Sequence, residues 1–141
     1  MRLSHLTLPL LLAACTSATT DAPSQGRHAE RIAAAQPSGT PENCVELNRI
    51  RSSRVLSDQI IDFELIDGRV MRNVLPYKCS GLGFSEAFTY STSLSRLCSV
   101  DTITVLNQGG GPHRGATCGL GQFQPVTFPA RYRKKLCAAG R

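Results

Sequence analysis

The chain has 141 residues, a formal net charge of +6, six cysteines and no tryptophan. Its length favours a single domain. A composition of 41% hydrophobic and 18% charged residues excludes both an acidic disordered tail and a protein built mainly of membrane spans. The cysteines and the positive charges are unevenly distributed along the chain, so their positions are more informative than their numbers.

The N-terminus has the pattern of an export signal. Arg2 is followed by an apolar run over residues 3–12 and then by small residues. The run is about half as long as a membrane-spanning helix needs to be, so it is a poor transmembrane segment. We therefore predict that residues 1–14 are a signal peptide that is removed on export.

The end of this signal, Leu12-Ala13-Ala14-Cys15, resembles the lipobox of bacterial lipoproteins. The resemblance implies cleavage before Cys15, a diacylglycerol thioether on its sulfur and a further acyl chain such as palmitate on its amino group. Two or more acyl chains hold a protein stably on a membrane. Thr16 stands where an aspartate would resemble an inner-membrane retention signal, so we expect the outer membrane, with the protein facing the periplasm. The alternative is an ordinary secretory signal with a chance cysteine.

Residues 15–43 are predicted to be the lipid anchor followed by a flexible tether. Residues 17–43 contain three prolines, many small residues and few large apolar ones, so they cannot bury enough surface to order themselves. A coil of this length has a root-mean-square span of roughly 25–30 Å. We expect a folded domain at 44–130, just off the membrane surface, and a basic tail at 131–141.

The pattern of residues 44–130 is typical of an all-β domain. Residues 84–93 are predicted to form a short helical turn followed by a strand, and Pro125 places the last strand at an edge or a bulge. No segment has a convincing helical period, so we predict a small antiparallel barrel or sandwich of about five to seven short strands. The clearest predicted strands cover residues 45–50, 60–65, 70–75, 102–106 and 122–128.

An Asp-Gly pair ending at Gly68 predicts a hairpin turn. A two-residue loop would place Phe63 opposite a charged residue. A three-residue loop puts the glycine at the left-handed position and places Phe63 opposite Met71 and Asp62 opposite Arg72. We prefer the second register because it pairs two apolar side chains and two opposite charges.

Five cysteines remain after Cys15 is assigned to the anchor. Export to an oxidising compartment favours disulfides. We predict the pairs Cys79–Cys98 and Cys44–Cys118, although the sequence leaves the other connectivities open. Cys137 has no assigned role: it is a free thiol, an intermolecular partner or another mate for Cys44. The chain has no C-x-x-C spacing, which argues against zinc and against a redox pair, so no metal or cofactor is expected.

Histidine limits the enzyme hypotheses. His5 lies in the signal and His28 in the predicted tether, so a catalytic site in the domain would have to use His113. The chain has no G-x-S-x-G motif, and the glycine loop at 109–115 lacks the lysine of a phosphate-binding loop. We expect a solvated His113 on a flexible loop.

Three carboxylates of the domain were considered as catalytic groups. Asp62 and Glu64 share one face of a strand, where a solvated sheet face is the simpler interpretation. Asp101 follows a turn at the start of a strand, where its side chain is expected to cap the backbone. None of them is assigned a catalytic role.

The positive charge is concentrated in the tail. Residues 131–141 contain five Arg and Lys and no acid, whereas the domain is nearly neutral. Arg131, Arg133, Lys134 and Lys135 could contact anionic lipid headgroups or acidic polysaccharide. A solvated tail without a partner is the alternative. The export signal argues against nucleic acid.

Two short motifs of the domain resemble each other. Cys79-Ser-Gly-Leu-Gly-Phe84 is similar to Cys118-Gly-Leu-Gly-Gln-Phe123, and each could be a cysteine-anchored glycine turn that leads into a strand. Two copies of so short a motif do not establish a repeat fold.

The domain as a whole resembles a group of small bacterial lipoproteins that share a domain of unknown function. The resemblance implies a β-rich periplasmic module and brings no activity, ligand or catalytic residue. It depends on Cys44, the Asp67-Gly68-Arg69 turn, Leu97-Cys98 before Asp101 and Ile103, and Cys118-Gly119-Leu120-Gly121.

These observations predict a cell-envelope lipoprotein with a non-enzymatic module that binds or scaffolds a partner. The partner would be an envelope protein, an anionic lipid or a polysaccharide, and the oligomeric state stays open. One alternative is a small periplasmic enzyme that uses His113 or a cysteine. Another is contact with an anionic surface through the basic tail.

Overall fold

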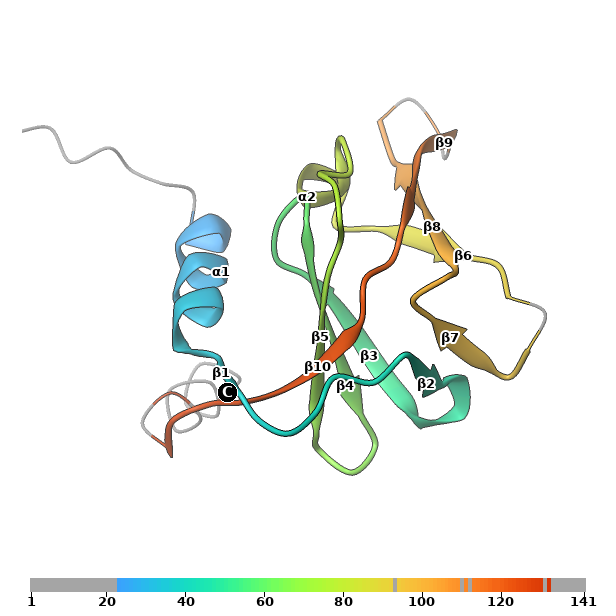
Figure 1. The fold of residues 1–141 in the computed structure, drawn as a ribbon. Coiled ribbons are helices and arrows are strands. Elements are labelled where there is room, and N and C mark those ends of the chain that lie inside the picture. The colour runs from blue at the N-terminus through green and yellow to red at the C-terminus, as the bar shows by residue number, and fades with distance from the viewer. Residues whose placement is uncertain (1–22, 93, 110, 112, 131, 133–141) are drawn as a thin grey trace, which may run out of the picture.

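The structure is a computed structural model, and it describes residues 23–92, 94–109, 111, 113–130 and 132 (Figure 1). Two α-helices and one 3-10 helix accompany ten strands. The helices are α1 (Pro23–Ala34), η1 (Leu47–Arg49) and α2 (Leu82–Ser85). The strands are β1 (Gln36–Pro37), β2 (Cys44–Glu46), β3 (Ile50–Val55), β4 (Ile60–Leu65), β5 (Val70–Val74), β6 (Phe88–Tyr90), β7 (Arg96–Cys98), β8 (Thr102–Asn107), β9 (His113–Gly119) and β10 (Phe123–Thr127).

The strands form three antiparallel sheets. The largest has the order β1-β10-β5-β4-β3, the second is β6-β8-β9, and the third is the pair β2-β7. The sheets do not close, so the all-β prediction is confirmed in its sandwich form. Pro125 lies in β10, which the edge strand β1 flanks over only two residues. The carbonyl oxygen of Pro125 accepts the Ser38 N–H at 2.8 Å. The strand count exceeds the predicted range because several of the strands have only two or three residues.

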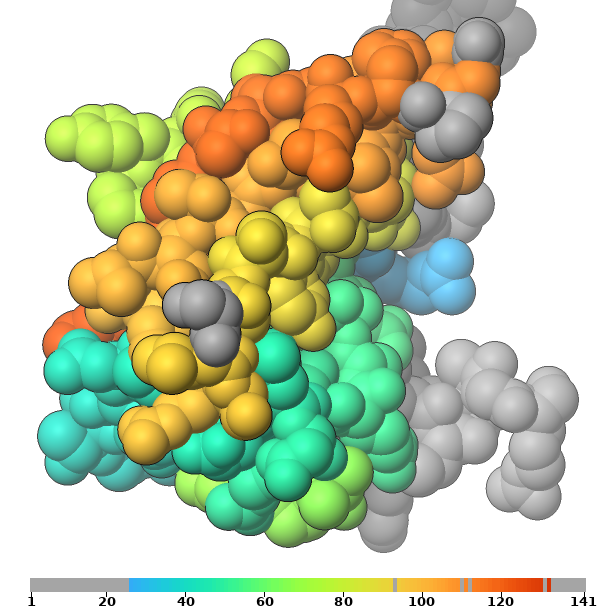
Figure 2. Space-filling view, turned by 90° about the vertical axis from the view of Figure 1, so that its right-hand side faces the viewer, coloured from blue at the N-terminus to red at the C-terminus, as the bar shows by residue number. Residues whose placement is uncertain are grey.

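The apolar core lies between the five-stranded and the three-stranded sheet. Phe63 of β4 packs edge-on against Phe123 of β10, with ring centroids 5.5 Å apart, and against Phe88 of β6, at 6.3 Å. Ile103 and Val105 of β8 are fully buried above them. In Figure 2 the yellow and orange segments form the centre and upper part of the face toward the viewer, and the teal segments lie below them. The alternating strands place their apolar side chains on this inner face.

The predicted register of the β4–β5 hairpin is confirmed. Phe63 faces Met71 and Asp62 faces Arg72. Gly68 has φ +84°, the left-handed conformation expected of the third loop residue.

The exposed hairpin loop is further fixed by its own charges. Asp67 accepts hydrogen bonds from the backbone and side chain of Arg69, at 3.0 and 2.9 Å. These bonds lower the pKa of Asp67. The hydrogen bond from the Arg69 side chain to the Asp67 carboxylate also raises the pKa of Arg69.

The four domain cysteines form two disulfides, but the predicted pairing is wrong. The structure joins Cys44 to Cys98 and Cys79 to Cys118. Cys44 and Cys98 are direct cross-strand partners in the β2–β7 pair, which the sequence pattern did not reveal. Cys79 precedes α2 and reaches β9, where Cys118 pairs with Ile103. The first pairing follows from strand register and the second from the position of the segment before α2 against β9, and both are long-range properties.

The second disulfide connects the two similar glycine motifs. Leu82 and Leu120, the leucines of the two motifs, are both buried. A side chain at Gly83 would meet the Asp58 backbone nitrogen at 3.0 Å, and one at Gly121 would meet the Val74 carbonyl oxygen at 2.2 Å. The final glycine of each motif is thus required by a close backbone approach.

The predicted tether is wrong for residues 23–43. Residues 23–34 form α1, which lies against the outer face of the five-stranded sheet, opposite the three-stranded sheet (Figure 1). The chain then pairs with β10, first through β1 and again where Glu42 bridges Phe123. The packed unit consequently begins well before Cys44. Composition predicted disorder because α1 has no apolar stripe, whereas the structure holds it with a buried charge.

Candidate functional site

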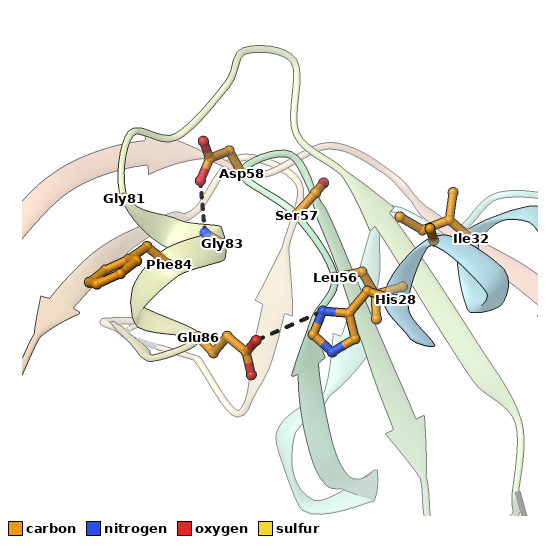
Figure 3. Close-up of a pocket in the computed structure, with 10 residues that line it drawn as sticks. His28, Ile32, Leu56, Ser57, Asp58, Gly81, Gly83, Phe84 and Glu86 are labelled. Carbon is orange, nitrogen blue, oxygen red and sulfur yellow. Dashed lines mark hydrogen bonds and ion pairs between the residues drawn. The ribbon is translucent and has the colours of Figure 1, made fainter. Parts of the chain in front are cut away.

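A depression lies between α1 and α2, and we call it the α1–α2 groove (Figure 3). Its volume is about 540 Å³. Three segments that are far apart in the sequence contribute its walls: α1, the turn between β3 and β4, and the region of α2. The lining residues are His28, Ala29, Ile32, Leu56, Ser57, Asp58, Gly81, Gly83, Phe84 and Glu86.

Asp58 organises one wall of the groove. Its Oδ1 accepts the Gly83 N–H at 2.8 Å, and its carbonyl oxygen accepts the Cys79 N–H at 2.7 Å. The turn between β3 and β4 is thereby joined to both ends of the segment that enters α2. Because Cys79 is disulfide-bonded to Cys118, this wall is also anchored to the opposite sheet.

His28 and Glu86 connect the two helices across the groove. His28 Nδ1 lies 3.8 Å from Glu86 Oε1, which is an ion pair when the imidazole is protonated (Figure 3). Glu86 ends α2 in the left-handed conformation, with φ +48°. The apolar side chains of Ile32 and Leu56 lie beside this pair.

Phe84 stands at the rim of the groove and is the most exposed of the large apolar side chains that the structure describes. Its exposed fraction is 95%, and the neighbouring loop carries Tyr77 with 84%. Aromatic rings bury a large area when they contact a partner. Phe84 is therefore a candidate contact residue at the rim, and Tyr77 is a second exposed ring in the loop that leads into α2.

A second cluster, the outer charge cluster (Arg31, Asp62, Glu64 and Arg72), holds α1 in place. Arg31 Nε donates to Asp62 Oδ2 at 2.7 Å, and its Nη2 donates to Glu64 at 3.1 Å. Arg72 donates to both Asp62 oxygens, at 2.7 and 3.1 Å. The Arg31 guanidinium also lies 4.7 Å from the centre of the Phe128 ring, which stacks on Tyr132.

The outer charge cluster overturns one prediction. Asp62 and Glu64 do share a sheet face, but Asp62 is completely buried rather than solvated. Arg72 also donates to the carbonyls of Arg31 and Ile32, in the last turn of α1, where a cation complements the helix dipole. All four groups have structural partners, which is the usual condition for burying charge.

The remaining predicted groups have separate positions. Asp101 accepts the Cys98 N–H at 2.7 Å, as predicted for a capping side chain. His113 is exposed, begins β9 instead of lying in a loop, and contacts the Gly111 carbonyl oxygen through Nδ1 at 3.1 Å. It does not line the α1–α2 groove.

The lipidation and tail predictions concern residues outside those described. These are Cys15, Cys137, Arg131, Arg133, Lys134 and Lys135. Within the described part of the chain, no three His, Cys, Asp or Glu side chains are grouped so that they could hold a metal ion. No helix there has the length and apolarity to cross a membrane.

Sequence reasoning missed the groove because two of its walls were assigned to other roles. The composition of residues 17–43 predicts a tether for His28 and Ile32, and no local pattern singles out Glu86. The only local signal was the spacing of Ala29 and Ile32, which puts them on one helix face next to residue 28. Comparisons with protein families, curated proteins and solved structures found no match for the chain.

Proposed function

We propose that this protein is a lipid-anchored module of the bacterial cell envelope that binds or scaffolds a partner without catalysing a reaction. Cys15 would carry the lipid, and the outer membrane, with the module in the periplasm, is the proposed location. The proposal keeps the function predicted from the sequence and adds the α1–α2 groove as the candidate binding surface.

The observation that carries the proposal is that three aspartates of the domain and its four described cysteines are engaged in holding it together. Asp62 is buried between two guanidinium groups, Asp58 accepts the Gly83 N–H, and Asp101 accepts the Cys98 N–H. The four described cysteines are all in disulfides. Such groups stabilise a fold and are not poised as nucleophiles or general acids.

The disulfides also support export. Each connects segments far apart in the chain, with sequence separations of 54 and 39 residues. Stable disulfides are typical of the periplasm and of other oxidising compartments. A domain of this size has a thin apolar core, so two such crosslinks add a large share of its stability.

The groove supports a binding role through its composition. Its wall combines the apolar Ile32 and Leu56 with the carboxylates of Asp58 and Glu86. Small-molecule and peptide sites combine apolar surface with a few fixed polar groups in this way. An apolar ligand that carries a cationic group would complement these walls.

The experiment that tests the proposal follows the lipid on the whole protein. Wild-type and Cys15→Ser chains are expressed with labelled palmitate, the cells are fractionated, and the intact masses are measured. We expect label, membrane association and the added lipid mass only in the wild type. Equal mass and fractionation of the two chains would refute the anchor, and free thiols at Cys44, Cys79, Cys98 and Cys118 in vivo would refute export to an oxidising compartment.

A further inference from the structure

We propose that the end of the domain formed by the start of α1 and by α2 faces the lipid bilayer, with Phe84 in contact with the lipid. The inference rests on the lipid anchor of the proposed function. It adds a specific orientation and a specific contact residue, and it commits to the bilayer as the partner of the exposed aromatic surface.

The first argument is the short distance along the chain. Pro23, the first residue of α1, comes eight residues after Cys15. Eight residues span at most about 29 Å when fully extended, and roughly 14–17 Å as a flexible coil. A lipid on Cys15 therefore keeps the start of α1 close to the membrane surface, so the elements beside that start are the ones that can reach the bilayer.

The second argument is that Phe84 borders the groove that the middle of α1 also lines. His28 and Phe84 line the same groove, and His28 lies 3.8 Å from Glu86 at the end of α2. In Figure 1 the first turns of α1, α2 and the loop from β5 to α2 lie at one end of the molecule, and the β4–β5 turn lies at the other. The start of α1, to which the proposed anchor is joined along the chain, and the exposed aromatic surface thus lie toward one end.

The third argument is the combination of exposure and rigidity at that end. Phe84 and Tyr77 are 95% and 84% exposed, although their loop is held firmly. Cys79, between them, is bonded to Cys118 and donates its N–H to the Asp58 carbonyl. A rigid support presents the rings without the entropy cost of ordering a flexible loop. Tyr rings are enriched at headgroup level in membrane–water interfaces, and Phe is among the apolar residues that interfacial proteins bury at the boundary between headgroups and acyl chains.

The charges at this end suit a contact driven by apolar area. Asp58 accepts a backbone N–H, Glu86 lies 3.8 Å from the His28 imidazole, and the exposed cations Arg27 of α1 and Lys78 of the loop offset these two carboxylates. With so little net charge, the contact should form on zwitterionic lipid and should change little with salt. A contact made by the basic tail would instead require anionic lipid.

The absence of tryptophan from the chain makes the test specific, because one substitution introduces the only indole. Phe84→Trp and Ile66→Trp variants of the full lipidated protein are placed in phosphatidylcholine vesicles with ordinary or brominated acyl chains. Ile66 is the control, because it is 62% exposed in the β4–β5 turn at the far end. We expect a blue-shifted, bromine-quenched emission from the Phe84→Trp variant and an unshifted, unquenched emission from the control.

The outcomes separate the orientation from the anchor. Intact mass without lipid would overturn the proposed function, and the orientation with it. A lipidated Phe84→Trp variant that is quenched no more than the Ile66→Trp control would overturn the orientation alone. The quenching should also survive Arg133→Gln, Lys134→Gln and Lys135→Gln substitutions made together. Its loss in that variant would overturn the inference, because the tail would then set the orientation.

Discussion

The two faces of strand β4 are both covered, but by opposite kinds of chemistry. On the inner face, Ile61, Phe63 and Leu65 pack against other apolar side chains of the sandwich. On the outer face, Asp62 is as deeply buried as Phe63, yet its contacts are two guanidinium groups. Alternation along one strand therefore produced two buried layers instead of one buried and one solvated layer.

The difference shows how a short polar helix can become part of a fold. An apolar layer gains stability from the area removed from water and does not depend on direction. The outer layer depends on a few directed, charge-assisted hydrogen bonds, which are strong only when every partner is present. We expect mutations on the outer face to act abruptly and to be strongly coupled.

The largest expected effect comes from removing the shared carboxylate. Asp62→Ala leaves Arg31 and Arg72 buried without their common counter-ion, which should lower the free energy of unfolding by about 3–5 kcal/mol in urea titrations. An Asp62→Leu, Arg72→Met double variant should lose less than the sum of its two single variants. Strict additivity would show that the outer cluster is not a coupled unit.

The second-largest effect is expected from removing the disulfide between Cys79 and Cys118. A Cys79→Ala, Cys118→Ala double variant opens a loop of 39 residues and should lose about 2–4 kcal/mol of stability. The measurement compares urea midpoints of the variant and of the wild type, each with and without reductant. If this crosslink matters as expected, reductant will destabilise the wild type much more than the variant; an equal response would contradict the prediction.

Removing the helix side of the outer cluster should have a smaller and more local effect. In Arg31→Ala, Asp62 keeps its two bonds to Arg72, so the loss should be about 1.5–3 kcal/mol. Hydrogen exchange should increase in α1 while the amides of β4 and β5 stay protected. Arg54→Ala is the matched control, since its exposed pair with Glu64 at 3.7 Å should contribute less than about 1 kcal/mol. Uniformly faster exchange would argue against a separately docked helix.

The two glycines of one motif should behave differently. Gly121→Ala places a methyl group against the Val74 carbonyl and disturbs Asn73, whose side chain bonds to both the N–H and the carbonyl of Gly121. We expect a loss of about 1–3 kcal/mol. In Gly119→Ala the added methyl group meets open space, so the free energy of unfolding, measured by thermal denaturation, should change by less than about 0.5 kcal/mol. Similar losses at both positions would contradict the close-approach explanation.

The smallest effect is expected from removing the carboxylate of Asp67 in the exposed hairpin turn. Hydrogen bonds from the Arg69 backbone and side chain lower the pKa of Asp67 in the folded state. The stabilisation of the folded state by the Asp67 carboxylate is therefore fully present above its unfolded-state pKa of about 3.9. This stabilisation is lost as the pH falls through the lower pKa of the folded state. Urea midpoints should show a small deficit of Asp67→Asn at neutral pH that disappears in strong acid. A deficit that grows on acidification would reverse the assigned sign.

Local patterns predicted the parts of the fold that depend on neighbours in the chain. The β4–β5 hairpin, its register and the left-handed Gly68 follow from turn chemistry and cross-strand pairing. The short helix before β6 and the capping role of Asp101 were likewise local. Interactions among a few neighbouring residues are enough to favour these local structures.

The disulfide pairing and the groove required contacts that no local pattern reports. Cys44 meets Cys98 because β2 and β7 pair across the sequence. The groove exists because α1 lies beside α2, and α1 is held by a cation whose carboxylate is 31 residues away. A helix that packs through charged side chains lacks the apolar stripe by which a sequence pattern reveals a packed helix.

By itself, the sequence determined an all-β domain with four disulfide-bonded cysteines, because strand alternation, turn residues and cysteine content are local properties. Only the tertiary structure decided which cysteines pair, that Asp62 is buried and that residues 23–43 belong to the packed unit. The physical reason is that burial of a charge depends on its partners in space. Arg31, Asp62 and Arg72 become an interior layer only when the helix and the sheet are brought together.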